Sequence, residues 1–297
     1  FAYNKIRTVT FEDGIQLESY YDDPCGSAYV GSGYKGIIPV YMFRDNPVVN
    51  VYIPETINAI GHYSFYNCPL TGEIDWGGVT KIGNYGLYGN GFSGEFRIPE
   101  WITFIGKEAL LNDTITKLYV PASLEFSSLS IGRGCIVNPD ADIVVDPANP
   151  VWQVEDGVLY MGNTLIRPLA NYYEGAKVFT VREGTKRIET NAFQNCEFEA
   201  VAVPESVKIV GDYAFGGNVS VVYFRGDAPI LEWGSDLSTG YNPQAYVASY
   251  RNFGAAASVY HKNGVEGFDG NSYVQQNLTL DVLDVGAMIQ TLPQATS

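Results

Sequence analysis

Positive charge is scarce in this chain, which has 18 Lys and Arg residues against 33 Asp and Glu residues and a formal net charge of −15. Proteins that bind nucleic acid or an anionic membrane use clusters of Lys and Arg to replace counterions, so the balance argues against both partners. No apolar run approaches the roughly 18 residues of a membrane-spanning helix, and we expect no membrane insertion. Because the chain begins at Phe1 rather than at a Met, we expect a processed chain without its signal or anchor segment.

Cysteine and histidine are also sparse. The cysteines show no CxxC pair or zinc-ligand spacing, and a chain of 297 residues needs no disulfide framework, so we expect free, mostly buried thiols. They neither establish nor exclude an oxidising compartment. The histidines, His62 and His261, lack a motif such as HExxH, and we interpret both as ordinary surface residues. The four cysteines are Cys25, Cys68, Cys135 and Cys196.

Three short motifs resemble functional sites, but each lacks the context that its chemistry needs. Residues 31–36 match GxGxxG without the βαβ unit of a dinucleotide site, and residues 91–95 lack the final Gly of a GxSxG elbow. Residues 138–149 space Asp and Asn like a calcium loop, but Ile143 and Asn149 replace the required Gly and Glu. We interpret all three as turns or loops and predict no catalytic residue, cofactor or metal. A carboxylate pair for glycoside hydrolysis stays open, because such a pair needs only spatial closeness.

The chain is rich in tyrosine and glycine, with 22 and 32 residues, and 46% of it is hydrophobic. This apolar content is enough to offset the entropy of ordering, so the chain folds. Aromatic side chains suit a pleated surface and Gly suits tight corners. The composition therefore predicts a turn-rich β architecture.

An Ile-Gly dipeptide or a close variant recurs along the chain. The steps between copies are 22, 23 and 26 residues, then 57, then 22, and Ile38 with Phe43 extends the series towards the N-terminus. A large apolar residue stands five positions after each Ile or Val. The copies are Ile60-Gly61, Ile82-Gly83, Ile105-Gly106, Ile131-Gly132, Ile188-Glu189 and Val210-Gly211, followed by Phe65, Leu87, Leu110, Ile136, Phe193 and Phe215.

Short alternating segments that end in Pro precede several copies, at 51–54, 96–99, 118–121 and 201–204. Alternation marks a half-buried strand, and Pro ends it. A period of 20 to 29 residues with one short strand is the signature of a leucine-rich-repeat coil. The pattern predicts a β-rich (α+β) solenoid, a right-handed coil with one strand per repeat of about 22–23 residues and short helical or 3₁₀ turns.

The repeats resemble those of the BspA-like leucine-rich-repeat family, whose units read as a strand, Ile-Pro, Ile-Gly, then Ala-Phe and Cys or Asn. The match is close at residues 191–196, 203–207 and 210–215. Cys68 and Cys196 share one repeat position, so we expect both to face the interior. The resemblance covers roughly residues 37–230. It implies a bacterial protein, extracellular or at the cell surface, that engages host or neighbouring-cell macromolecules.

The sequence within the 57-residue interval between Ile131 and Ile188 also resembles that of the family. The runs Asp156–Tyr160 and Thr164–Arg167 flank Gly162-Asn163, which we interpret as the tight turn of an inserted β-hairpin.

We assign residues 1–230 to the solenoid, with an insertion at 16–36 in the first unit and the hairpin elaboration at 137–180. Residues 231–297 are assigned to a C-terminal cap, because the last unit of a solenoid must hide its apolar edge.

Outward side chains of the stacked strands align on one sheet face, which is the candidate binding site. Aromatic and Arg side chains carry much of interface energy, although Tyr also suits an ordinary solvated sheet face. The candidate ligand-binding residues are Tyr52, Asp75, Trp76, Arg97, Trp101, Lys117 and Tyr119, and Asn50, Glu73, Glu95, Ala200 and Ala202 complete the predicted outward set. The insertion, with Tyr20, Tyr21, Tyr29 and Tyr34, is a rival surface.

These observations predict a binding protein and not an enzyme. We expect an extracytoplasmic protein-interaction or adhesion module, with a protein or glycan ligand on a cell or matrix surface. The alternative is a carbohydrate-binding or structural module of a larger secreted protein. Coplanar, exposed aromatic rings on the sheet face would favour sugar stacking, and a face of mixed charge would favour protein binding.

Overall fold

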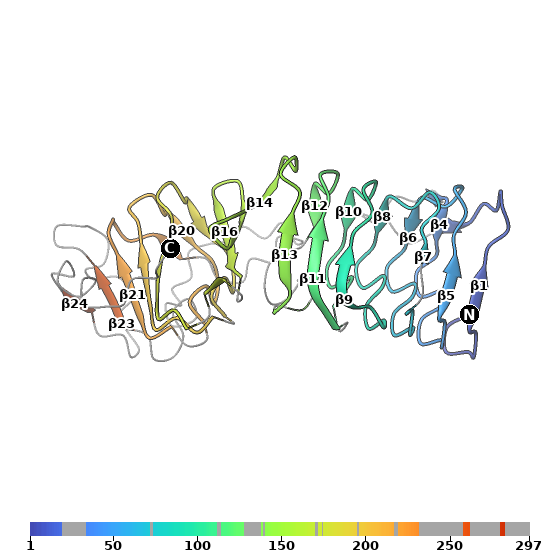
Figure 1. The fold of residues 1–297 in the computed structure, drawn as a ribbon, viewed down its shortest axis with the longest axis horizontal. Coiled ribbons are helices and arrows are strands. Elements are labelled where there is room, and N and C mark those ends of the chain that lie inside the picture. The colour runs from blue at the N-terminus through green and yellow to red at the C-terminus, as the bar shows by residue number, and fades with distance from the viewer. Residues whose placement is uncertain are drawn as a thin grey trace. The chain divides into compact units, whose positions relative to one another are not determined.

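The protein is a β-solenoid in which each repeat makes one coil (Figure 1). The computed structural model describes residues 1–19, 34–71, 74–111, 114–127, 138, 140–169, 172–173, 175–194, 196–216, 219–231, 258–261 and 280–282. Contacts divide the chain into unit 1, residues 1–129 with 133–153, and unit 2, residues 130–132 with 154–297. Within the described ranges there is no α-helix, and none that could cross a membrane.

The predicted strands form parallel ladders in unit 1. Val51 and Leu118 point inward and are buried, whereas Tyr52 and Arg97 alternate with them and are exposed, as the pattern predicted. The strands pair in the orders β1-β5-β7 and β9-β11-β13, with β1 at Thr8–Thr10, β5 at Asn50–Tyr52, β7 at Ile74–Asp75, β9 at Ser93–Arg97, β11 at Thr114–Val120 and β13 at Asp142–Val145.

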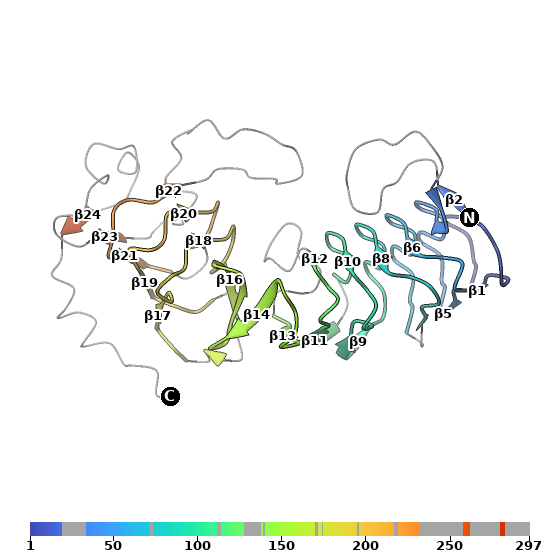
Figure 2. The same cartoon turned by 90° about the horizontal axis from the view of Figure 1, so that it is seen from above.

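A second parallel ladder runs along another side of the same coils (Figure 2), so the expectation of one strand per repeat was incomplete. At Ile60, Ile82 and Ile105 it lies at the Ile of an Ile-Gly dipeptide, and two residues are too few for alternation to reveal a strand. Short turns follow it, as predicted, without helix in the described part of unit 1; for example, the Tyr66 N–H donates to the Tyr63 carbonyl. The strands are β4 (Ile37–Ile38), β6 (Ala59–Ile60), β8 (Lys81–Ile82), β10 (Phe104–Ile105) and β12 (Phe126–Ser127).

The Gly of the dipeptide is required by the close approach of adjacent coils. A Cβ atom on Gly83 would lie 2.8 Å from the backbone nitrogen of His62, and one on Gly211 would lie 2.4 Å from that of Thr190. Both distances are below van der Waals contact, so any side chain would push the coils apart. Glu189 replaces Gly where the preceding strand belongs to the hairpin.

Unit 2 contains the predicted hairpin. Strands β15 (Val158–Met161) and β16 (Thr164–Pro168) pair antiparallel around Gly162, whose φ is +56°. One sheet has the order β14-β15-β16-β18-β20-β22, with β14 at Trp152–Glu155, β18 at Arg187–Ile188, β20 at Ile209–Val210 and β22 at Ile230–Leu231. The other has the order β17-β19-β21-β23-β24, with β17 at Val178–Thr180, β19 at Ala200–Val203, β21 at Val221–Phe224, β23 at Ser258–His261 and β24 at Leu280–Val282.

The insertion and the cap are described only in part. The ends of the insertion pair as the antiparallel strands β2 (Glu18–Ser19) and β3 (Tyr34–Lys35), whereas residues 20–33 lie outside the described ranges. Beyond residue 231, β23 continues the ladder from β21, and β24 pairs with β23. The boundary between solenoid and cap stays a prediction.

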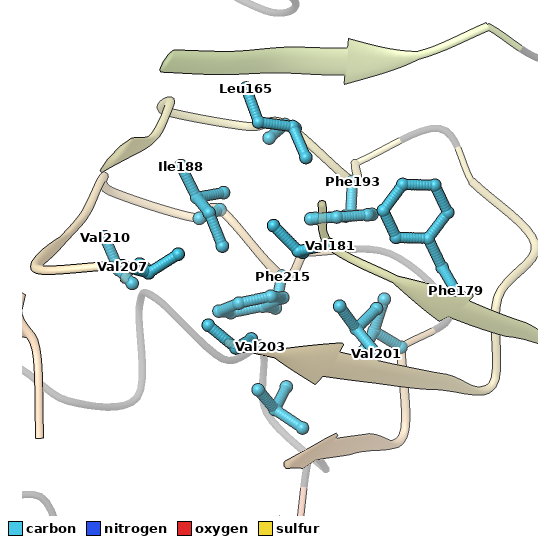
Figure 3. Close-up of a cluster of buried hydrophobic side chains, with 14 of the residues drawn as sticks. Leu165, Phe179, Val181, Ile188, Phe193, Val201, Val203, Val207, Val210 and Phe215 are labelled. Carbon is cyan, nitrogen blue, oxygen red and sulfur yellow. The ribbon is translucent and has the colours of Figure 1, made fainter. Parts of the chain in front are cut away.

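The core of each unit is a stack of the apolar residues that the repeat predicted. In unit 2, Phe193 stacks on Phe215 with ring centroids 5.5 Å apart, and Ile188, Val201 and Val210 close around them (Figure 3). In unit 1 the equivalent pair is Phe43 and Phe65, at 5.2 Å. Each coil thus buries its apolar edge against the next.

A polar atom recurs three residues after the core Phe or Leu. The Cys68 thiol donates to the Phe43 carbonyl at 3.1 Å, and the Asn90 amide donates to the Phe65 carbonyl at 3.1 Å. Each bond reaches back to the preceding coil. These side chains therefore donate hydrogen bonds to buried carbonyls that have no partner within the strand ladders.

The two described thiols are free, as predicted, and Cys68 is fully buried while Cys196 is partly buried. Burial raises the pKa of Cys68 to about 11 and that of Cys196 to about 12. Both thiols are therefore protonated near neutral pH. They are unreactive in this form, because the thiolate is the nucleophile. Cys25 and Cys135 lie outside the described residues.

Replacing Asn90 with Ala is expected to lower the free energy of unfolding by about 1–3 kcal/mol, because the buried Phe65 and Leu87 carbonyls and the Leu70 N–H lose a partner. Asn90→Cys is expected to lower the free energy of unfolding by less, because Cys68 shows that a thiol at this repeat position donates a hydrogen bond to the preceding coil. Urea unfolding measures both. Equal stability of wild type and Asn90→Ala would contradict this role.

Alkylation resolved by residue tests the burial of the thiols. At pH 8 we expect Cys68 and Cys196 to react with iodoacetamide at least about a hundredfold more slowly than in urea, because raised pKa values leave almost no thiolate. Peptide mass spectrometry gives the rate at each site. Similar rates in folded and unfolded protein would show that these positions are open.

Candidate functional site

The strand face of unit 1 carries a compact group of charged and aromatic side chains, which we call the strand-face cluster: Glu95, Arg97, Lys117, Tyr119 and Asp142. The parallel register of β9 and β11 sets Glu95 beside Lys117 and Arg97 beside Tyr119. Asp142 stands beside Lys117 on β13. Three of the predicted site residues are thus brought together by the ladder.

Tyr119 is the centre of this cluster. The guanidinium carbon of Arg97 lies 3.6 Å from the centroid of the Tyr119 ring, and the Lys117 ammonium lies 5.6 Å from it. The Tyr119 hydroxyl donates to a Glu95 carboxylate oxygen at 3.1 Å, and Lys117 lies 3.8 Å from an Asp142 oxygen. Exposed contacts of this kind add little stability, about 0.5–1 kcal/mol for the cation–π pair. Their effect is to hold Arg97 and Tyr119 in one arrangement.

Tyr52 and Asp75 form a second group on the same unit, paired in register on β5 and β7. Tyr52 is 43% exposed, and a shallow groove of about 470 Å³ runs between its strand, β1 and β7. Negative charge on Asp13, followed by burial and by Asp75 and Glu55, raises the pKa of Tyr52. The phenol is therefore neutral near pH 7 and lies among carboxylates.

The two tryptophans do not share one environment. Trp76 follows Asp75, the partner of Tyr52, so it takes the inward repeat position of Ile53 and is half-buried. Trp101 lies on the turn after β9 and is 50% exposed. Among the described rings, no stacked or tilted pair joins any two of Tyr52, Trp76, Trp101 and Tyr119. These four candidates therefore form no continuous aromatic platform.

Ala202 of unit 2 takes the predicted outward register position but is only 4% exposed. It stands between Thr180 and Tyr223 on the paired strands, and its methyl group is too short to reach past them. Ala200 is half-buried and Asn50 is exposed, whereas Glu73 lies outside the described residues. Among the described strand residues of unit 2, no group like the charged cluster of unit 1 is present.

A second aromatic feature of unit 1, absent from the predicted site, lies on the turns. We call it the tyrosine ladder; its first row is Tyr41, Tyr63 and Tyr85, with ring centroids 5.0 and 4.7 Å apart. Its second row is Tyr66 and Tyr88, stacked at 4.7 Å. Tyrosine two positions before the core Phe or Leu was a readable signal in the repeat.

Arg44 distinguishes the tyrosine ladder from ordinary surface rings. The Arg44 guanidinium carbon lies 4.8 Å from the Tyr66 centroid and 5.5 Å from that of Tyr41. Tyr41, Tyr63 and Tyr85 have φ values of 57°, 55° and 58°, a region that costs a bulky residue about 1 kcal/mol or more.

Burial raises the pKa of Tyr63, Tyr85 and Tyr88, and a hydrogen bond from the Tyr85 hydroxyl to Glu108 at 2.9 Å raises that of Tyr85 further. The phenols of Tyr63, Tyr85 and Tyr88 are therefore neutral near pH 7. They serve as hydrogen-bond donors and not as anions or bases.

The remaining candidates for chemistry have structural partners or lie outside the described ranges. The Nδ1 atom of His62 accepts the Asn84 N–H at 2.7 Å, so this half-buried histidine joins two coils and is not a simple surface residue. Over the described part of the chain, no group of three or more His, Cys, Asp or Glu side chains could hold a metal ion. Tyr20, Tyr21 and Tyr29 are not described, and Tyr34 begins β3.

Three solved structures are similar to this chain at low sequence identity. A leucine-rich repeat protein from Eubacterium ventriosum ATCC 27560 gives a TM-score of 0.52 at 17% identity, over 83% of this chain and 70% of that one. The pneumococcal vaccine antigen PcpA gives 0.48 at 14% identity, over 95% and 90%. A leucine rich cell surface protein from Faecalibacterium prausnitzii A2-165 gives 0.40 at 14% identity, over 99% and 92%.

No curated protein matches the sequence significantly. A sequence profile of the BspA type leucine rich repeat region matches six copies, at residues 29–136 and 166–230, which is more than half of the chain. The matched segments include the Ile-Gly coils of both units. By its repeat and by the coil that the repeat builds, the chain belongs to the BspA type leucine-rich-repeat family.

Proposed function

We propose that this chain is an extracytoplasmic interaction module that binds a protein ligand through the strand face of unit 1. The observation that carries the proposal is the strand-face cluster, in which Arg97 and Tyr119 are already held together at 3.6 Å. Arg and Tyr are enriched among the residues that dominate binding energy at protein interfaces. Held in place before binding, they lose less side-chain entropy when a ligand arrives.

The charge pattern supports a protein ligand over a sugar. The strand-face cluster has two cationic and two anionic side chains around one ring, and the neighbouring Tyr52 lies close to Asp13 and Asp75. Mixed charge of this kind gives specificity between protein surfaces. A sugar-stacking platform would need adjacent open aromatic faces, which Tyr52, Trp76, Trp101 and Tyr119 do not supply.

Location outside the cytoplasm and a role in adhesion are part of this proposal. Membership of the BspA type repeat family supports both. A host or neighbouring-cell macromolecule is the corresponding class of ligand.

An array of purified extracellular-matrix proteins and glycans, probed with the folded protein, tests the proposal. We expect at least one protein ligand, and we expect Arg97→Ala and Tyr119→Ala each to weaken its binding about tenfold or more, which corresponds to at least about 1.4 kcal/mol. Arg225→Ala is the matched control, because Arg225 is a partly exposed arginine on unit 2, where it pairs with Glu183.

Circular dichroism of each variant confirms folding before binding is compared. Glycan ligands alone would contradict a protein-binding module. A protein ligand whose affinity is unchanged by Arg97→Ala and Tyr119→Ala would move the site away from the strand face.

A further inference from the structure

The tyrosine ladder is not used by the strand-face proposal, since its residues lie on turns and not on the outward side of β5, β9 or β11. We infer that the tyrosine ladder is a second binding surface, and that it takes a proline-rich segment in the polyproline II conformation. The inference stands on the composition, the order and the spacing of these rings.

The composition matches the centre of a protein interface, where Tyr and Arg are enriched and unpaired charge is depleted. Four tyrosine rings, Tyr3, Tyr41, Tyr63 and Tyr66, lie 4.8 to 5.8 Å from the Arg44 guanidinium carbon, and the nearby charges are paired among themselves. The Arg44 guanidinium lies 2.8 Å from Asp45, and the Lys107 ammonium lies 4.0 Å from Glu108. In a chain with a net charge of −15, this locally balanced surface suits an uncharged partner.

The rings are ordered before any partner arrives. Tyr63 is stacked on both sides, by Tyr41 and by Tyr85, and Arg44 lies close to both rows. The first row places three tyrosines where the backbone is left-handed, which strains a bulky residue. The core does not require tyrosine there, because Asn, which tolerates this backbone better, occupies the same repeat position at Asn191 with a φ of 57°. Strained positions of this kind gather at binding sites.

The stacking favours a peptide over a sugar. The faces within each row cover one another, so a sugar ring has few open faces on which to stack. Between the two rows the rings are tilted, with Tyr63 and Tyr66 at 46° and Tyr66 and Tyr85 at 56°. Proline-rich segments dock in grooves lined by aromatic side chains in other recognition domains.

The spacing agrees with a polyproline II ligand. Such a helix has three residues per turn and rises about 3.1 Å per residue, so one turn spans about two steps of the tyrosine ladder. The steps of the first row are 5.0 and 4.7 Å. A polyproline II segment makes no internal hydrogen bonds, and its carbonyls are free to accept bonds from tyrosine hydroxyls.

Binding of fluorescein-labelled nonaproline, followed by polarisation, tests this inference, with a Gly-Ser peptide of equal length as the reference. We expect nonaproline to bind the wild type and Tyr63→Asn to weaken it about tenfold or more. Asn suits the left-handed backbone, as Asn191 shows, so folding is retained. Tyr213→Asn is the matched control: it is the same change at the same repeat position, with a φ of 51°, outside the tyrosine ladder.

Tyr63→Phe separates the ring from its hydroxyl and should lose less affinity than Tyr63→Asn. Circular dichroism and urea unfolding check that each variant is folded. Absence of nonaproline binding to the wild type, or equal binding by wild type and Tyr63→Asn, would overturn the inference. Tyr63-dependent binding of a neutral hexose oligosaccharide in place of nonaproline would overturn it in favour of a glycan site.

Discussion

Adjacent coils lie one strand spacing apart, about 4.8 Å in a β-ladder, and every repeat position is therefore stacked on its own copy. Ring spacings of 5.2 Å for Phe43 and Phe65 and 4.7 Å for Tyr63 and Tyr85 follow from this constraint. The same closeness excludes a Cβ atom at Gly83. The stacking of side chains in the core, on the turns and on the surfaces therefore follows from the same register between coils.

Stacking in register also turns a repeated sequence into extended surfaces. On the strand face it sets Arg97 against Tyr119, and on the turns it sets Tyr63 against Tyr85. The first surface has mixed charge and the second is locally neutral. Unit 2 keeps the coil but places Ala200 and Ala202 on its strand face, so the core pattern does not itself dictate a binding surface.

The sequence predicted the features that depend on periodic burial. The core series that includes Phe65 and Phe215, the hairpin at Gly162 and the outward positions of Tyr52 and Arg97 could be read directly, because side chains alternate along a strand and repeat from coil to coil. Features that depend on packing between coils could not be predicted from the sequence. Trp76 was placed with the ligand-binding residues, yet the register gives it the position of Ile53. The two-residue strands are too short for alternation to reveal them, and the recurring tyrosines do not themselves reveal a left-handed backbone.

Removal of one complete repeat tests the central claim most directly. Deleting the 22 residues Gly61–Ile82 joins Ile60 to Gly83 and restores the Ile-Gly dipeptide, whereas deleting only residues 61–71 breaks the register. Because each coil contacts its neighbours alone, the account predicts that the first variant folds, with β-type circular dichroism and one cooperative urea transition, and that the second does not. Loss of folding on removal of the complete repeat, or equal tolerance of both deletions, would contradict it.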